Sequence, residues 1–331
     1  MMDGGMQPGK YLWECMENGT ARLLRVYARN NPVVIPDKLE GHVLSSIGAY
    51  CFSNAEHLPD KNIRETYLSA EETDRLHLHL MAGMDIEYLE LPDSVIEIQD
   101  LAFYNCKSLI SLQVGKYTKN IGSDVFMNCH ALKTLQIRGG IQEPSGASAI
   151  LHRIASEIEV HFLGSDHGTE ACLLYPEYTE SYDEIAPAHI FGRNITGEGF
   201  RARQLFADEI VQLDRYDAIL EKVAAEENDL TVGRLALLRL LYPVGLRPEK
   251  QREYEHYIRQ NGFVTAKYYI DLRDQETLQK MCENRYLQGN DLDEAIQYCV
   301  SVKWGEGSAH LLDWKQRFAS TDRRNRYTFE D

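Results

Sequence analysis

The chain has 331 residues, of which 44% are hydrophobic and 26% are charged, and its formal net charge is −16 at pH 7. This length suits about two globular domains. The negative charge argues against a nucleic-acid partner, because binding to phosphates requires a basic surface. No apolar run reaches the roughly 18 residues of a membrane span, and no secretory signal is visible at the N-terminus.

Seven cysteines without a dense spacing pattern are typical of a reducing compartment. We therefore expect a cytoplasmic protein with no membrane partner and no nucleic-acid partner. A cell-surface location stays open if a signal segment was removed from the natural chain.

The first predicted element is a β-hairpin formed by residues 11–15 and 22–27. The dipeptide Asn18-Gly19 lies between them and is a strong signal for a tight hairpin turn. The residues that follow form a repeat, and a terminal repeat needs a covered end. We expect the hairpin to cap the first coil of that repeat.

Residues 86–137 contain a repeat with a step of 23 residues. Five positions recur with the same residue type: Ile98, Phe103, Cys106, Leu109 and Leu112 return as Ile121, Phe126, Cys129, Leu132 and Leu135. The segments IEYLEL, LISLQV and LKTLQI alternate in polarity, which is typical of a strand with one buried face. Stacked in register, the inward side chains predict two ladders, Leu89–Leu112–Leu135 and Leu91–Val114–Ile137.

A looser copy of the repeat lies between residues 33 and 58. The corresponding positions are Ile35, Ile47, Phe52, Ala55 and Leu58. Between this copy and the next lies an insertion near residues 59–84, in which AEETDRLHLHLM predicts a helix.

Two stretches carry a family resemblance: LPDSVIEIQDLAFYNCKSL, which starts at Leu91, and VGKYTKNIGSDVFMNCHAL, which starts at Val114. They are similar to the BspA-type leucine-rich repeat of bacteria, over roughly residues 10–140. Gln99, Val125 and Ala55 depart from its pattern, but these are packing positions. The resemblance implies a solenoid that binds proteins, and it raises the alternative of a bacterial surface adhesin.

Beyond a last predicted strand at residues 158–163, the repeat is lost. The aromatic and proline-containing residues 166–200 predict an irregular connector. Apolar residues then recur at helical spacing from residue 201, and predicted caps at Thr231, Asp274 and Asp291 divide the rest into short helices. Such helices normally pack as antiparallel pairs, and residues 289–315 loosely resemble an ankyrin-type helix pair.

The predicted fold class is therefore α+β with two domains. Residues 1–165 form a hairpin cap and a short BspA-type leucine-rich-repeat solenoid, residues 166–200 a connector, and residues 201–331 an all-α helical-pair domain.

Three sets of residues could carry chemistry. Cys106 and Cys129 would lie on adjacent coils, but a buried free cysteine usually acts as a small apolar filler. His77 and His79 have no third ligand beside them. Glycines at 192, 197 and 199 lie near arginines at 193, 201 and 203, yet the phosphate-binding loop motifs are absent. We predict no catalytic residue, no metal and no cofactor.

The residues between the buried ladder positions face outward in two columns: Tyr88, Glu90, Ser111, Gln113, Thr134 and Gln136. A regular surface of this kind is what solenoids use for binding. The main hypothesis is a non-enzymatic interaction or scaffold module of a bacterial cell. It would bind an unknown protein partner through this strand face and through an acidic helical domain. The alternatives are a surface adhesin, and an enzyme or nucleotide-binding protein with a site at residues 192–203.

Overall fold

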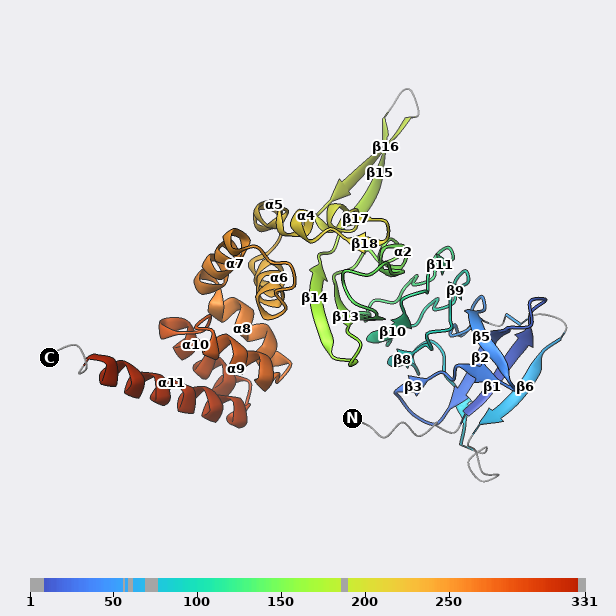
Figure 1. The fold of residues 1–331 in the computed structure, drawn as a ribbon, viewed down its shortest axis with the longest axis horizontal. Helices are drawn as coiled ribbons and strands as arrows, with labels where there is room; N and C mark the ends of the chain where they lie inside the picture. The colour runs from blue at the N-terminus through green and yellow to red at the C-terminus, as the bar shows by residue number, and fades with distance from the viewer. Residues whose placement is uncertain (1–8, 56, 59–61, 69–76, 186–189, 327–331) are drawn as a thin grey trace. The chain divides into compact units, whose positions relative to one another are not determined.

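The computed structural model describes residues 9–55, 57–58, 62–68, 77–185 and 190–326 (Figure 1). The chain divides into two compact units, Met1–Tyr216 and Asp217–Asp331. The N-terminal unit is a β-solenoid built around two sheets, and the C-terminal unit is helical. This confirms the predicted α+β class with two domains.

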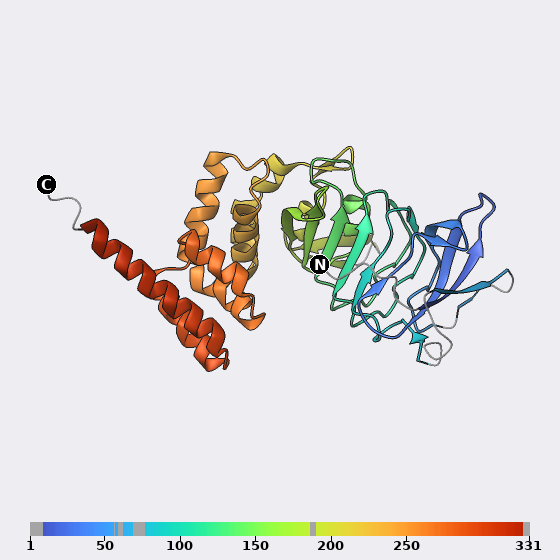
Figure 2. The same ribbon diagram turned by 60° about the horizontal axis from the view of Figure 1, so that its bottom comes forward.

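Sheet B contains the predicted ladders. Its strands, in spatial order, are β3 (Val33–Val34), β8 (Tyr88–Glu90), β10 (Ser111–Gly115), β12 (Thr134–Arg138), β13 (Ile158–Leu163) and β14 (Thr169–Tyr175). Only β14 runs antiparallel to its neighbour. Leu112 lies opposite both Leu89 and Leu135, which confirms that ladder, and Val114 lies opposite Ile137. All of these side chains are buried, and Figure 2 shows the strands of sheet B side by side.

Sheet A lines the other side of the coils. In spatial order it contains β11 (Asn120–Ile121), β9 (Glu97–Ile98), β5 (His42–Ile47), β2 (Ala21–Ala28), β1 (Gly9–Cys15) and β6 (Arg64–Leu68), with β4 (Lys38–Leu39) on β5 and β7 (His79–Leu80) on β2. β1 and β2 form the predicted hairpin, and Gly19 in its turn has φ +80°. β2 pairs with β5 of the first coil, so the hairpin caps the solenoid as predicted.

Three phenylalanines stack between the sheets. The ring centroids of Phe52 and Phe103 are 5.0 Å apart, and those of Phe103 and Phe126 are 5.4 Å apart, with nearly parallel planes. The phenylalanine that recurs in the repeat therefore stacks from coil to coil, and the stack includes Phe52 of the first copy. A residue with positive φ precedes each phenylalanine by two positions: Tyr50, Leu101 and Asp124. Only a small part of that backbone region is open to residues other than glycine, so the same tight turn recurs in each coil.

The repeated cysteines join neighbouring coils. The Cys106 thiol donates to the carbonyl of Phe52 at 3.1 Å, and the Cys129 thiol donates to the carbonyl of Phe103 at 3.0 Å. Both cysteines are free and buried. The pKa of Cys106 is raised, mainly by a hydrogen bond with the Cys129 thiol and secondly by burial. Burial also raises the pKa of Cys51. The protonated thiol is therefore the form that the folded state stabilises.

These raised pKa values predict a loss of stability in alkali. In the unfolded chain a thiol ionises near its ordinary pKa of 9.0, whereas in the folded chain Cys51 and Cys106 stay protonated. The contribution of these two thiols to the free energy of unfolding is therefore fully present below pH 9, and it is lost as the pH rises above 9. The loss at pH 10 is on the order of 1 kcal/mol for each thiol. Urea unfolding at pH 8 and pH 10 measures it. In Cys106→Ala the difference between the two pH values should shrink by about that amount, and an unchanged difference would contradict the prediction.

The helix predicted in the insertion spans residues 70–81, and its residues 70–76 lie outside the described residues. Of the rest, residues 77–81 are not helical, and His79–Leu80 form β7. The described part of the insertion before it contains β6, which the sequence did not predict. β6 becomes a strand because the edge of β1 offers it unpaired backbone groups, and Thr66 accepts a hydrogen bond from the Trp13 indole at 2.8 Å. This pairing across more than 50 residues leaves no local signal.

The irregular connector is also wrong. Residues 169–175 form β14, and β15 (Thr179–Ile185) pairs with β16 (Ile190–Thr196) as a hairpin. The apolar segment Ala171–Tyr175 is buried against β13, so a proline just after it ends a strand instead of marking an irregular region. The residues from 201 up to the predicted cap at Thr231, where apolar spacing predicted helix, do not form one continuous helix. The structure instead has α3 (Gly199–Ala202), β17 (Phe206–Ala207), β18 (Ile210–Val211), α4 (Leu213–Asp217) and α5 (Leu220–Glu226). Asp208 and Glu209 form the hairpin turn with positive φ angles.

The helical unit continues with α6 (Asp229–Leu241), α7 (Pro248–Gln260), α8 (Gly262–Asp271), α9 (Gln275–Glu283), α10 (Gly289–Ser301) and α11 (Gly305–Arg326). Consecutive helices pack as pairs, including α6 with α7 and α10 with α11. Their apolar faces enclose a core that includes Leu237, Ile258, Ile270, Met281 and Trp304. Among the described helices, none is both long and apolar enough for a membrane span.

The helix caps are partly as predicted. Asp274 caps α9 by accepting from the Thr277 amide at 3.0 Å, as expected. The cap of α6 is Asn228, three residues before Thr231, which is the donor. Asp291 lies inside α10 and accepts instead from the Phe263 amide of α8 at 3.3 Å. A contact between helices has thus taken the place of a capping box.

Candidate functional site

The outer face of sheet B brings the six predicted site residues together. Ser111 lies opposite Tyr88 and Thr134, and Gln113 lies opposite Glu90 and Gln136. The next strand adds Glu159 opposite Thr134 and His161 opposite Gln136. We call these two sets the tyrosine column (Tyr88, Ser111, Thr134, Glu159) and the glutamine column (Glu90, Gln113, Gln136, His161). Members of each column are one strand spacing apart, about 4.8 Å.

The columns are accessible from outside the sheet. Tyr88 is 41% exposed, and the other members are half-buried. Their functional groups are mainly a phenol, hydroxyls, amides and carboxylates, all held on paired strands. Such groups form directional hydrogen bonds, and at neutral pH hydroxyl and amide groups do not exchange protons readily. The arrangement is suited to recognition of polar groups on a partner.

A hollow of about 450 Å³ lies along the glutamine column. Its lining consists of Glu90, Gln113, Gln136, Arg138, Leu163, His167 and Thr169. Arg138 is fixed at the rim by two contacts: its Nε lies 2.5 Å from the Asp93 carboxylate, and its Nη2 donates to the Leu91 carbonyl. The hollow therefore offers a carboxylate, two amides and an anchored guanidinium to an incoming group.

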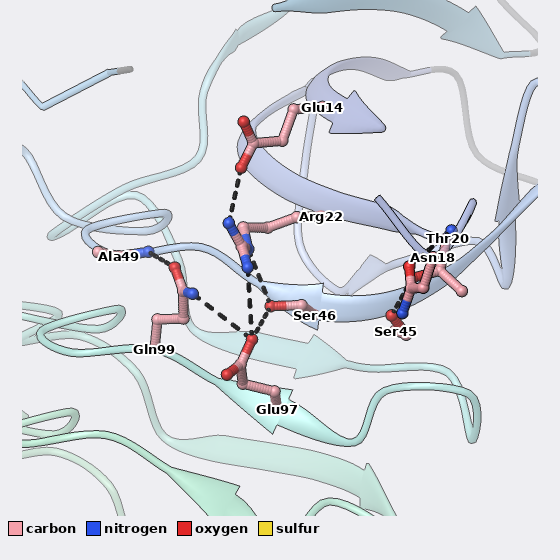
Figure 3. Close-up of polar contacts among 9 residues, drawn as sticks. All are labelled: Glu14, Asn18, Thr20, Arg22, Ser45, Ser46, Ala49, Glu97 and Gln99. Carbon is pink, nitrogen blue, oxygen red and sulfur yellow. Dashed lines mark hydrogen bonds and ion pairs between the residues drawn. The ribbon is translucent and has the colours of Figure 1, made fainter. Parts of the chain in front are cut away.

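A second polar surface crosses sheet A (Figure 3). One residue from each of five successive strands contributes to it: Glu14, Arg22, Ser46, Glu97 and Asn120, paired in that order. We call this set the sheet A row. Its charged residues alternate in sign: Glu14, Arg22 and then Glu97. Arg22 is therefore attracted to Glu14 on the adjacent strand β1 and to Glu97 on β9, beyond Ser46.

Glu97 is the centre of the sheet A row. Its Oε2 accepts from the Ser46 hydroxyl at 2.6 Å and from the Gln99 amide at 3.5 Å, and it lies 3.8 Å from the Arg22 guanidinium. Arg22 also forms an ion pair with Glu14 at 2.8 Å. Figure 3 shows Arg22 of β2, Ser46 of β5 and Gln99 converging on Glu97, while Glu14 contacts Arg22. The contacts leave the carboxylate held in one orientation.

A hollow of about 500 Å³ lies beside the sheet A row. It is lined by Ala49, Glu97, Ile98, Gln99, Asp100, Asn120, Ile121 and Gly122. A nearby set of hydrogen bonds holds the cap hairpin in place. Asn18 accepts from the amide and hydroxyl of Thr20, whose hydroxyl lies 2.7 Å from that of Ser45 (Figure 3). The sheet A row is thus a rigid surface. More of its polar groups are already hydrogen-bonded to one another than in the tyrosine and glutamine columns, so fewer are available to a partner.

The repeat in the sequence also contains the sheet A row. Asn120 and Glu97 are one 23-residue step apart, and each directly precedes an aligned isoleucine. In the first copy the residue before the aligned Ile47 is Ser46. The alignment that predicted the buried isoleucines therefore also predicted a polar neighbour on the opposite face.

The repeat of the N-terminal unit matches a known repeat family. Residues 76–147 match a family model described as "BspA type Leucine rich repeat region (6 copies)". The BspA-type resemblance is thereby confirmed. The first copy, at residues 33–58, lies outside the matched residues but stacks on the BspA-type coils through β3 and β5. The comparisons with curated proteins and with solved structures gave no match.

The BspA-type match indicates a module for protein–protein interaction or adhesion. Solenoids of this kind are typically non-enzymatic, and they act through regular surfaces. In the C-terminal unit the ankyrin-type likeness rests only on the helix pair formed by α10 and α11.

The remaining candidate residues from the sequence are the histidines at 77 and 79 and the arginines at 193, 201 and 203. His77 and His79 are exposed. Arg193 forms a two-bond ion pair with Glu180, and Arg201 pairs with Glu198. Arg203 is buried, and it donates to four backbone carbonyls, those of Ile154, Ser156, Pro176 and Gly199. Burial lowers the pKa of Arg203 to about 10. These arginines hold the chain together where the β15–β16 hairpin leaves the solenoid.

Proposed function

We propose that this chain is a non-enzymatic module of a bacterial cell that binds a protein partner through the tyrosine and glutamine columns of sheet B. The observation that carries the proposal is the register of β8, β10, β12 and β13, which repeats a polar group at each step of the coil. A regular array with a fixed spacing can match the spacing of groups on a partner. Its rigidity lowers the entropy lost on binding.

The charge of the chain suggests which partner suits it. The helical unit was expected to be acidic, but residues 217–331 contain 20 acidic and 17 basic side chains, a net charge of −3. The N-terminal unit therefore carries −13 of the total −16. The helical unit thus has only a small net negative charge, and most of the acidity of the chain lies in the N-terminal unit. A partner with a basic surface would be steered towards the solenoid, at a rate that falls with salt.

The cellular location that we propose is cytoplasmic. The Cys106 and Cys129 thiols act as hydrogen-bond donors to the carbonyls of the preceding coil, and this role requires the reduced S–H form. A reducing compartment maintains that form. Fractionation of the native cells, with an antibody to this chain, tests the location. Recovery in the surface fraction would favour the adhesin alternative instead.

A triple variant of the columns tests the proposed surface. Tyr88→Ala/Gln113→Ala/Gln136→Ala removes a phenol and two amides while leaving the buried ladders intact. We expect partner affinity to fall by at least about 10-fold, since interface hot spots typically contribute more than 1 kcal/mol each. Affinity capture from the native organism identifies the partner, and calorimetry with the purified pair measures the change.

The matched control lies on the sheet A side of the same coils. Tyr117→Ala/Gln99→Ala/Asn120→Ala also removes one phenol and two amides; Gln99 and Asn120 line the sheet A hollow, and Tyr117 is an exposed tyrosine three residues before Asn120. This variant should bind as the native chain does, and thermal unfolding should show both variants folded. If the control loses the partner while the column variant retains it, the recognition surface is the sheet A row and the proposal is wrong.

A further inference from the structure

Three side chains with metal-binding atoms converge at the end of sheet B. Glu159 and His161 are two residues apart on β13, so they point to the same face. Cys172 on β14 is the direct cross-strand partner of His161 and shares that face. One ligand atom from each residue lies within 4.8 Å of the other two, and the His161 Nε2 is 3.6 Å from the Glu159 carboxylate.

The donor set selects a class of ion. A thiolate, an imidazole and a carboxylate are the ligands of Zn²⁺, whereas Mg²⁺ and Ca²⁺ require oxygen ligands. Bond lengths to zinc of about 2.0–2.3 Å place tetrahedral ligands roughly 3.5 Å apart. The spacing of His161 and Glu159 already meets this value. The sulfur of the fully buried Cys172 lies within 4.8 Å of both, and it has to move closer to complete the site. We propose that Glu159, His161 and Cys172 form a zinc site.

The strands make the site well suited to a metal. β13 is paired on both sides, with β12 and with β14, and its alternate residues Val160 and Phe162 are fully buried. The ligand backbones are therefore fixed, and binding orders only the three side chains. Three protein ligands leave a fourth coordination position for water or for a donor from another molecule. His161 belongs to the glutamine column, so the ion lies at one end of that surface.

Calorimetric titration of the reduced 331-residue chain with Zn²⁺ tests the site directly. We expect one ion per chain. Cys172→Ala and His161→Gln should each weaken binding by at least about 10-fold, because even residues that only support a ligand contribute this much. Binding should also weaken in mild acid, since protons compete for the imidazole and the thiolate. Co²⁺ bound in place of zinc should show the near-ultraviolet sulfur-to-metal charge-transfer absorption, and Cys172→Ala should abolish it.

Cys15→Ala is the matched control. The Cys15 sulfur lies 3.6 Å from the Nδ1 of His42, so this pair is the natural competitor for a soft metal ion. The control variant should bind zinc as the native chain does. The proposal would be overturned by absence of binding, by loss of the ion in Cys15→Ala, or by variants Cys172→Ala and His161→Gln that bind zinc as tightly as the native chain does. These measurements need no protein partner, so they stand independently of the proposed interaction.

Discussion

Phe103→Ala is expected to destabilise the N-terminal unit by about 3–5 kcal/mol, the usual cost of deleting a fully buried aromatic ring. Phe103 is completely buried and stacks on both Phe52 and Phe126. Its loss leaves a cavity between two coils, and neither neighbour can fill the cavity without giving up its own contact. Phe126→Ala should cost less, because Phe126 is 7% exposed and lies at the end of the described stack.

Hydrogen exchange of residues 86–137, read by mass spectrometry, measures this loss in the solenoid itself. Urea unfolding followed by circular dichroism gives the free energy. Met127→Ala is the control, since Met127 belongs to the same coil but is 49% exposed; its change should stay within about 0.5 kcal/mol. A Phe103→Ala change below 1 kcal/mol, or an effect no larger than that of Phe126→Ala, would show that the stack does not hold the coils together.

Asp217→Ala should destabilise the helical unit by about 3–5 kcal/mol, because it leaves a buried charge without its partner. Asp217 forms a two-bond ion pair with Arg239, at 2.8 and 3.0 Å, and both side chains are almost completely buried. Asp217 also accepts from the hydroxyl of buried Tyr254 at 2.9 Å. Burial, together with the Asp217 charge, raises the pKa of Tyr254, so that hydroxyl remains a donor.

The double variant Asp217→Leu/Arg239→Met separates two explanations. Replacing both charges with apolar groups of similar size is often neutral or stabilising, so the double variant should recover most of the loss. Glu276→Ala removes an exposed partner of Lys280 and serves as the control, with an expected cost below about 1 kcal/mol. If Asp217→Ala costs no more than Glu276→Ala in urea unfolding, the buried pair is not what fixes these helices.

The solenoid was predictable because its information is periodic. A fixed step of 23 residues places Leu89, Leu112 and Leu135 in one ladder, and alternation then fixes the outward columns. The hairpin cap was predictable from Asn18-Gly19, since few residues tolerate its turn. In each case the residue types that decide the structure are neighbours in sequence or recur at a constant interval.

The features that sequence reasoning missed depend on partners far apart in the chain. β6 pairs with β1 across the first coil, and Asp217 meets Arg239 between helices. Neither contact has a local pattern. The same holds for Cys172 and His161, which face one another only because β14 turns back along β13. The proline before β15 was interpreted as part of an irregular segment, and the turn at Asp208 as part of a helix. Both errors arose because strands as short as these show little periodicity in the sequence.

The reversed direction of β14 bears on how such a molecule could lengthen in evolution. A strand that runs against its neighbours ends the stack, since another winding of the same kind has no parallel edge to join there. Gene duplication can instead add windings inside the stack, between Leu91 and Ile137, where each strand has parallel neighbours. Each duplication of 23 residues would extend both outward columns by one polar group, so the reach of the recognition surface could change while both ends of the stack stay the same.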